Sequence, residues 1–401
     1  MQMNNSNKAR KITLKRGKDA SLRRFHPWIF SGAIQSYDKD IVDGDVVRVF
    51  SSDGEYLATG HYQRGSIAVR ILSFDDEEID KEFWKRRIAI ASELRHTIFY
   101  NATKETNMYR LVHGEGDNLS GLIVDVYGET AVMQAHSTGI HRSRHDIAEA
   151  IVDVMQGKIT SVYYKSATTL PYAEESEERD GFLIGKTQEN VAIENGLKFA
   201  IDWEKGQKTG FFVDQRDNRN LAFQYAKGRK VLNMFCYTGG FSVYALSGGA
   251  ELVHSVDSSA KAIDITRQNI DLNFPDITVH EAYAEDAFKF LQRMEPEFYD
   301  MIILDPPAFA KHLNAVKSAL RGYTRLNAQA IAKIAHGGIL FTFSCSQAVN
   351  KEQFRLAVFT AAAEAKRKVR ILHQLHQAPD HPINIYHPEG EYLKGLVLYV
   401  E

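Results

Sequence analysis

The chain has 401 residues, 44% of them hydrophobic, which is enough for two or three domains that each bury a core. It lacks a run of about 18 apolar residues, and its basic start lacks an apolar secretion segment, so we expect a cytoplasmic protein that does not span a membrane. Its two cysteines, Cys236 and Cys345, are too few for a disulfide framework or a structural zinc site, and we expect no metal.

The net charge of −2 conceals two basic segments. Residues 1–30 contain eight Lys or Arg and one acid, and residues 311–370 contain eleven Lys or Arg and two acids. Clustered positive charge suits a polyanion such as RNA, because neutralised phosphates supply most of the nonspecific affinity for nucleic acid. Two ordinary solvated faces are the alternative, and charge alone does not decide between them.

The pattern of apolar residues predicts three domains. Residues 1–75 contain short strands separated by turn signals, which is typical of a small β-barrel. Residues 76–190 begin with an amphipathic helix and then combine strands with a second helix near 143–155, which predicts an α+β domain. Residues 191–401 alternate seven apolar strands with helices, the pattern of a doubly wound, mostly parallel sheet.

Three positions in residues 191–401 indicate an adenosine-containing ligand. The first strand-to-helix turn contains Thr238-Gly239-Gly240, where glycine lets the backbone approach a ligand. The second strand ends at Asp257, whose carboxylate can accept hydrogen bonds from both ribose hydroxyls, and Asp286 follows the third strand, where an adenine amino group would be read. Ordinary turn chemistry for the glycines and helix capping by Asp257 are the open alternatives.

The next two strands end in residues suited to chemistry. The fourth strand leads into Asp305-Pro306-Pro307-Ala308-Phe309, in which two prolines form a rigid edge beside the ligand's reacting end. The fifth strand ends in Ser344-Cys345-Ser346, so Cys345 should lie at the same edge, where a thiolate could act as a nucleophile. Cys236 lies inside the first turn, and we expect it to line the cofactor pocket or to pack.

These segments resemble class I S-adenosylmethionine-dependent methyltransferases, and within them the bacterial 23S ribosomal RNA large-subunit cytosine-5 methyltransferases. The resemblance spans nearly the whole chain, and its N-terminal part is similar to a PUA domain, an RNA-binding module. It implies a seven-stranded Rossmann-like domain preceded by a PUA-type β-barrel and a central α+β domain. Its most specific segments are FFVDQRDNR (211–219), NMFCYTGGFS (233–242), LDPPAFAK (304–311), LRGYTRLN (320–327), FTFSCS (341–346) and QAPDHPINIYHPEGEYLKG (377–395).

The resemblance implies methyl transfer from S-adenosylmethionine to carbon 5 of a cytosine. Cys345 would add to carbon 6 as a thiolate, and Asp305 would hydrogen-bond the N3 and amine edge of the base. The cofactor-binding residues that it implies are Gln215, Asn233, Phe235, Tyr237, Thr238, Gly239, Asp257, Ser258, Asp286 and Asp305. Those implied to contact RNA are Pro306, Pro307, Arg23, Arg24 and Phe309, the last by stacking on the base.

One departure keeps other functions open. Many RNA cytosine-5 methyltransferases have a second cysteine just after the fourth strand, whereas Ala308 and Phe309 stand there in this chain. A methyltransferase acting on a base nitrogen and a noncatalytic RNA-binding assembly factor are therefore alternatives, while a nicotinamide oxidoreductase lacks its glycine fingerprint here. The sequence does not identify the target nucleotide, the base that removes the carbon 5 proton, whether 23S ribosomal RNA is modified free or in a large-subunit assembly intermediate, or whether the chain forms a homodimer.

Overall fold

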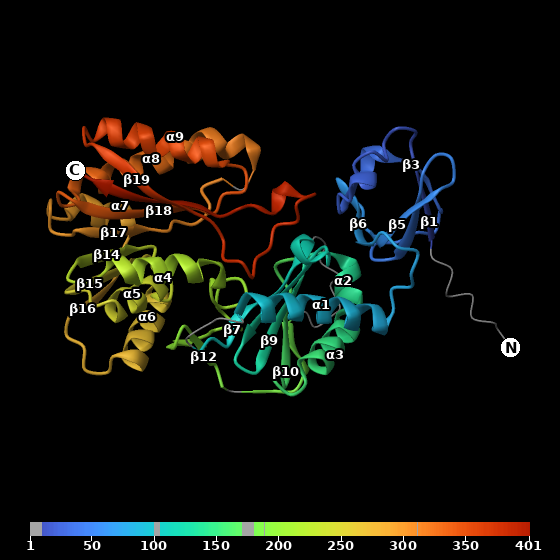
Figure 1. Ribbon diagram of the computed structural model, residues 1–401, viewed down its shortest axis with the longest axis horizontal. Helices are drawn as coiled ribbons and strands as arrows, with labels where there is room; N and C mark the ends of the chain where they lie inside the picture. The colour runs from blue at the N-terminus through green and yellow to red at the C-terminus, as the bar shows by residue number, and fades with distance from the viewer. Residues whose placement is uncertain (1–9, 100–104, 171–179, 188, 311) are drawn as a thin grey trace. The chain divides into compact units, whose positions relative to one another are not determined.

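The computed structural model describes residues 10–99, 105–170, 180–187, 189–310 and 312–401 (Figure 1). Its contacts divide the chain into two units. The N-terminal unit comprises residues up to 191 with 201–211 and 379–390, and the C-terminal unit comprises 192–200, 212–378 and 391–401. The predicted domain limits at 75 and 190 are a finer division and stay a prediction. Lys8 and Lys311, from the two basic segments, lie outside the described residues.

The first sheet of the N-terminal unit has six strands in the order β2-β6-β5-β4-β1-β3. Alternating apolar residues predict four of them, whereas β2 and β3 are too short to show the pattern. The pairings among the described strands leave β2 and β3 at the two ends, so these hydrogen bonds do not close a barrel. The bounds are β1 (Arg10–Leu14), β2 (Trp28–Phe30), β3 (Ile34–Tyr37), β4 (Val46–Phe50), β5 (Tyr56–Tyr62) and β6 (Ile67–Ser73).

The second sheet of this unit has five strands in the order β11-β10-β9-β8-β7, with α1 (Lys81–Phe99) and α3 (Arg144–Met155) packed on one another beside it. The other elements are β7 (Met108–His113), η3 (Gly114–Asp117), β8 (Leu122–Tyr127), β9 (Thr130–Ala135), α2 (Thr138–Arg142), β10 (Ser161–Lys165) and β11 (Asp180–Ile184). This is the α+β arrangement that the sequence predicts.

A buried arginine joins the segment 379–390 to this second sheet. Arg95 on α1 is 2% exposed and forms a bidentate ion pair with Asp117, with Nη2 2.8 Å from Oδ2. The same guanidinium donates to the backbone carbonyls of Arg110 and Asp380, each at 2.7 Å. Four polar groups from separate parts of the chain thus satisfy one another inside the unit.

The C-terminal unit contains a seven-stranded sheet in the order β16-β15-β14-β17-β18-β20-β19. Strand β20 runs opposite to the other six, so its pairings with β18 and β19 are antiparallel. Six of the seven strands lie where the sequence predicts them, whereas β16 starts three residues after the predicted start at Ile277. The helices α4, α5 and α6 cover one face and α7, α8 and α9 the other (Figure 1). The bounds are β14 (Lys230–Met234), α5 (Gly240–Ser247), β15 (Leu252–Asp257), α6 (Ala260–Asn273), β16 (His280–Ala284), α7 (Ala287–Arg293), β17 (Met301–Leu304), α8 (Val316–Lys333), β18 (Gly338–Ser344), α9 (Lys351–Glu364), β19 (Val369–Leu375) and β20 (Lys394–Val400).

Helix α4 (Arg216–Tyr225) is not predicted from apolar spacing, because most of its residues are polar. A buried ion pair holds it: Arg219 donates to both carboxylate oxygens of Glu194 at 2.8 and 2.7 Å, and both side chains are almost fully buried. Glu194 ends β12 (Val191–Glu194), which pairs with β13 (Leu197–Ala200), and it also accepts a hydrogen bond from the hydroxyl of Tyr244 at 3.0 Å. Among the described residues, no helix is both long and apolar enough to cross a lipid bilayer.

Removing the positive member of this pair should destabilise the C-terminal unit strongly. Arg219→Met leaves the Glu194 carboxylate buried without its cation, so we expect the free energy of unfolding to fall by about 3–5 kcal/mol. Arg267→Met is the matched control, because Arg267 pairs with Asp264 on the exposed surface of α6 and should cost less than about 1 kcal/mol. Equal losses in urea unfolding of the two variants would contradict the role given to Arg219.

Candidate active site

The carboxyl ends of the parallel strands bring the predicted residues to one edge of the sheet. Met234 pairs with Val256 on one side and with Leu304 on the other, and Leu304 pairs with Thr342. Three of these positions are followed directly by a predicted residue: Phe235 after β14, Asp257 at the end of β15 and Asp305 after β17. These residues emerge together, as expected for ligand sites of open α/β sheets. Strand β18 continues past Thr342 to Ser344, and Cys345 follows it.

The loop after β14 is tightly curled. Phe235, Tyr237 and Gly239 all have positive φ values, of 58°, 48° and 80°. The carboxylate of Asp257 holds this loop, because its Oδ2 accepts the backbone N–H of Tyr237 at 3.0 Å. Gly239 is needed for packing, since a Cβ there would lie 2.6 Å from the side chain of Thr266 on α6.

Helix capping does not account for Asp257. The N-cap of α6 is Ser259, whose hydroxyl accepts the backbone N–H of Ala262 at 3.2 Å. Asp286 does cap a helix, because its Oδ1 accepts the N–H of Lys289 at the start of α7. Ser258 and Asp286 are exposed, whereas Asp257 is half-buried.

Two buried polar atoms beside the curled loop fit an adenosine-containing ligand. Asn233 donates its amide N–H to Ser242 at 2.8 Å, and its Oδ1 has no hydrogen-bond partner. The hydroxyl of Thr238 is likewise buried without a partner. Because buried polar groups are nearly always paired, these atoms are available to the polar edge of a bound molecule.

Gln215 connects α4 to the fourth strand end. It follows Asp214 in the short helix η4 (Val213–Gln215), and its amide donates to Asp305 Oδ2 at 3.0 Å. Burial, followed by the charge of Asp214, raises the pKa of Asp305 to about 7, although the hydrogen bond from Gln215 works in the opposite direction. Near neutral pH this carboxyl group can therefore either accept or donate a proton.

Asp214 belongs to the site, although the sequence does not single it out. Its Oδ2 accepts a hydrogen bond from the hydroxyl of Tyr392 at 2.5 Å, whereas its Oδ1 is buried and has no partner. Its charge raises the pKa values of both Asp305 and Cys345. The only sequence signal is its place beside Gln215 in the FFVDQRDNR segment.

Cys345 is held between two anchored serines. Ser344 and Ser346 each contact the hydroxyl of Tyr323 at 2.9 Å, and Cys345 Sγ lies 3.8 Å from the carbonyl oxygen of Pro306. Burial raises the pKa of the Cys345 thiol to about 12, and the charges of Asp305 and Asp214 act in the same direction. At neutral pH the thiol is therefore protonated, while Asp305 is about half ionised. Cys236, by contrast, is packed against Thr266 inside the first turn.

Lys394 lies behind the Cys345 loop and is a second residue that the sequence does not single out. Its ammonium donates to the carbonyls of Ser346 at 2.7 Å and Val349 at 2.5 Å, and its side chain is 6% exposed. Burial lowers its pKa to about 8, while its charge favours ionisation of Cys345. Lys394 thus fixes the loop and opposes part of the negative field of the two aspartates.

The residues expected to contact RNA differ in solvent exposure and in the partners that they already have. Pro306 is buried and Pro307 is exposed, whereas the ring of Phe309 is half-buried and packs on Tyr323, with 4.6 Å between ring centres. A base could therefore use only the exposed part of the Phe309 ring. In the N-terminal unit, Arg23 is paired with two carboxylates, those of Asp19 and Glu55. Arg24 is exposed and forms no ion pair among the described residues.

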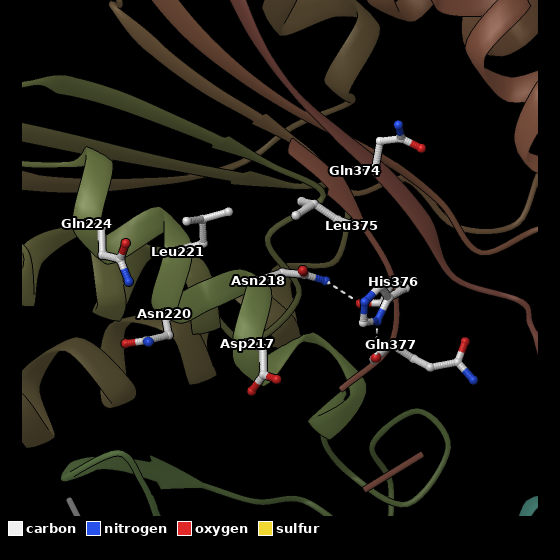
Figure 2. A pocket seen from close by; sticks show the side chains of 9 residues that line it. All are labelled: Asp217, Asn218, Asn220, Leu221, Gln224, Gln374, Leu375, His376 and Gln377. Atoms are coloured by element: carbon white, nitrogen blue, oxygen red, sulfur yellow. Dashed lines mark hydrogen bonds between the residues drawn. The ribbon is translucent and has the colours of Figure 1, made fainter. Parts of the chain in front are cut away.

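A polar hollow lies between α4 and the end of β19 (Figure 2). Asn218 lines it and donates from one amide nitrogen to the backbone oxygen of His376 at 3.1 Å and to Gln215 Oε1 at 2.6 Å. None of the predicted site residues lines the hollow, so we place the chemistry at the strand ends. The lining residues are Asp217, Asn218, Asn220, Leu221, Gln224, Gln374, Leu375, His376 and Gln377.

Known protein families match both parts of the chain. The family model for S-adenosylmethionine-dependent methyltransferases matches residues 173–389. The chain belongs to this family. A PUA-like domain model also matches residues 12–74 of the methyltransferase.

Curated relatives match almost the whole methyltransferase. A protein of Aeromonas hydrophila named ribosomal RNA large subunit methyltransferase I is 42% identical over 394 residues, which cover 96% of this chain and 98% of the relative. A protein of the same name from Tolumonas auensis is 41% identical with the same coverage of both chains.

Solved structures share the fold. An S-adenosylmethionine-dependent methyltransferase from Streptococcus mutans aligns with a TM-score of 0.82 at 22% identity, covering 97% of this chain and 100% of that chain. A methyltransferase crystallised with S-adenosylhomocysteine aligns with a TM-score of 0.83 at 23% identity and the same coverage. The predicted fold class and cofactor are therefore confirmed.

The buried carboxyl group of Asp305 predicts a pH-dependent stability. Because its pKa in the folded chain is about 7, above the ordinary 3.8, the folded chain keeps a proton that the unfolded chain has released between these values. This group's contribution to the free energy of unfolding therefore falls as pH rises from about 4 to 7.

Asp305→Asn should remove this dependence. We expect the variant to gain stability over the parent by about 1–2 kcal/mol near pH 8, which is roughly 2–8 °C in melting temperature, and to gain less near pH 4.5. Asp276→Asn, at an exposed aspartate, should show no such difference. A gain for Asp305→Asn that is the same at both pH values in thermal melts would exclude the proposed cause.

Proposed function

We propose that this methyltransferase transfers a methyl group from S-adenosylmethionine to carbon 5 of a cytosine in large-subunit ribosomal RNA. The observation that carries the proposal is the contact of Cys345 Sγ with Pro306, because it brings the thiol beside the Asp305-Pro-Pro element. The curated relatives support the RNA substrate, since their name is ribosomal RNA large subunit methyltransferase I.

The curled loop and its neighbours would hold the cofactor, which supplies an electrophilic methyl group on a sulfonium. Asp257 would accept hydrogen bonds from the ribose hydroxyls, and the unpartnered atoms of Asn233 and Thr238 would meet polar groups of the ligand. The remaining proposed contacts are Gln215, Phe235, Tyr237, Gly239, Ser258, Asp286 and Asp305.

Cys345 would make carbon 5 of the cytosine nucleophilic. Its thiolate forms a bond to carbon 6, and the electron pair of the C5–C6 double bond is displaced through the ring toward N3. Carbon 5 then takes the methyl group, its proton is lost to a base, and the C5–C6 double bond re-forms as the C6–S bond breaks and releases the thiolate. Every atom of the base except the carbon 5 proton is retained.

Asp305 would accept the thiol proton and donate a proton to the base during this addition. The ionised carboxylate can accept the proton of the Cys345 thiol, and the resulting acid can donate to N3 of the cytosine as charge develops there. Proton transfer also removes one of the two negative charges that raise the pKa of the thiol.

The N-terminal unit would bind the RNA around the target. A PUA-like domain matches residues 12–74, and Arg24 is exposed in it without an ion pair among the described residues. We propose Arg23 and Arg24 as phosphate contacts and 23S ribosomal RNA, free or in a large-subunit assembly intermediate, as the cytoplasmic partner. The cytosine must leave its stack to reach the strand ends, where Phe309 and the two prolines would contact it.

Methylation of a base nitrogen is the second candidate. The raised pKa of Cys345, about 12, favours it, because a thiol that stays protonated would only pack. The absence of a second cysteine at Ala308 or Phe309 points the same way. Asp305 and the prolines would then orient the target nitrogen.

Mass spectrometry of nucleosides from ribosomal RNA distinguishes methylation of cytosine carbon 5 from methylation of a base nitrogen. We expect RNA from cells without the protein to lack one 5-methylcytidine of the large subunit, and the purified enzyme with S-adenosylmethionine to restore it. Loss of a nitrogen-methylated nucleoside would assign the second candidate. No change would favour a noncatalytic role or another RNA.

The two cysteines provide a matched pair of variants for the covalent step. Cys345→Ser should lower the methylation rate at least 1,000-fold, because a serine hydroxyl is a far weaker nucleophile, while S-adenosylmethionine binding is retained. Cys236→Ser should keep most activity. In RNA containing 5-fluorocytosine, the trapped protein–RNA adduct seen by denaturing electrophoresis should vanish only for Cys345→Ser, and an adduct that persists would refute the mechanism.

Cofactor binding should depend on Asp257 and not on Cys345. Asp257→Ala removes the proposed ribose contact and the acceptor for the Tyr237 N–H, so we expect S-adenosylmethionine affinity to fall at least tenfold in calorimetry. Asp264→Ala, at an exposed aspartate on α6, is the control. Unchanged affinity in Asp257→Ala would place the cofactor elsewhere.

A further inference from the structure

Two histidines and a glutamate from opposite ends of the sequence meet in the N-terminal unit. His26 stands just before β2, while His387 and Glu389 lie in the segment 379–390, with Glu389 in the short helix η6 (Pro388–Gly390). Each offers one ligand atom, and the three atoms lie within 4.8 Å of one another, the only group of this kind among the described residues. None of the three takes part in the proposed methyl transfer.

His387 is the buried member of this group. Its residue is 3% exposed, and neither ring nitrogen has a hydrogen-bond partner. The ring of Trp28 packs on it at 4.3 Å between ring centres, which excludes solvent from that side. A buried imidazole whose two nitrogens are both unpaired is unusual and indicates an absent ligand.

The separations suit a bound metal ion better than hydrogen bonds. His387 Nε2 lies 3.7 Å from one carboxylate oxygen of Glu389, and His26 Nε2 lies 3.9 Å from the other. Both distances are too long for hydrogen bonds. Tetrahedral coordination with bonds of about 2.0–2.1 Å separates ligand atoms by about 3.4 Å. The three ligand atoms lie within 4.8 Å of one another, so a bound ion would draw them together by up to about 1.4 Å.

The second nitrogen of His26 contacts the backbone of Trp28. His26 Nδ1 lies 3.2 Å from both the carbonyl oxygen and the N–H of Trp28, so it can donate to the first or accept from the second. Metal binding at Nε2 requires the tautomer in which Nδ1 donates to the carbonyl. The indole of Trp28 is itself held by Glu115, to which its N–H donates at 2.8 Å.

We propose that His26, His387 and Glu389 bind one divalent transition-metal ion, with Zn²⁺ as the best match. Two imidazoles and one carboxylate favour zinc over magnesium or calcium, which prefer oxygen ligands, and water would take the fourth position. The ion would fasten the segment 379–390 to the six-stranded sheet. The expectation of no metal rests on the small number of cysteines, which does not bear on a site made of histidine and glutamate.

Cobalt provides a direct test, since tetrahedral Co²⁺ absorbs visible light and quenches a nearby tryptophan. Untagged full-length protein stripped with a chelator should bind one equivalent of Co²⁺, develop the visible bands of a tetrahedral site and lose part of its tryptophan fluorescence. Zn²⁺ should displace the Co²⁺ and raise the melting temperature. Methylation activity is not the readout, so the outcome is independent of the proposed reaction.

Substitutions test which residues bind the metal ion. His387→Gln and Glu389→Gln should each weaken Co²⁺ binding at least tenfold and abolish the fluorescence loss, with circular dichroism showing that each variant is folded. His336→Gln is the matched control, because His336 lies 3.6 Å from Glu297 in an exposed pair of the C-terminal unit, and it should bind as the parent does. The proposal is overturned if the parent binds no Co²⁺, if binding leaves the tryptophan fluorescence unchanged, or if His336→Gln weakens binding as much as the other two.

Discussion

The parallel register of β14, β15, β17 and β18 is the constraint on which the site depends. The pairings of Met234 with Val256 and Leu304 keep Asp257 and Asp305 level at the ends of β15 and β17. Cys345 follows the end of β18 beside them. Helices cover both faces of the sheet, so a slip of one residue in any strand would exchange the side chains packed against the two layers of helices. The same burial that stabilises the sheet therefore sets the positions of Asp257, Asp305 and Cys345.

Burial also controls the ionisation of the groups at the carboxyl ends of these strands. Asp214, Asp305 and Cys345 share a region of low solvent access, so each negative charge opposes the others. Lys394 compensates part of this charge at Cys345, and Arg219 does so at Asp305. Such a site disfavours free ionisation and favours proton movement between its own groups. For a proposed cytosine adduct this is an advantage, because a thiolate would be generated only where a base can accept it.

The sequence predicts most of this arrangement from short-range patterns. Seven apolar runs give the strands, and the polar residue that follows each run gives Asp257, Asp305 and Cys345. It does not predict the buried pair of Arg219 and Glu194 or the role of Lys394, since these depend on which distant segments meet in the folded chain. Charged residues usually mark the surface, and no local pattern distinguishes these buried exceptions.

The segment 379–390 leaves the C-terminal unit after β19 and returns to it before β20. Asp380 accepts from Arg95 across 285 positions of the sequence. During synthesis, which proceeds from the N-terminus, the first unit must therefore wait for Asp380 to emerge before its buried arginine is fully satisfied. By then β14 to β19 of the other unit have already been made, so the two units complete their folds together and are not separable modules.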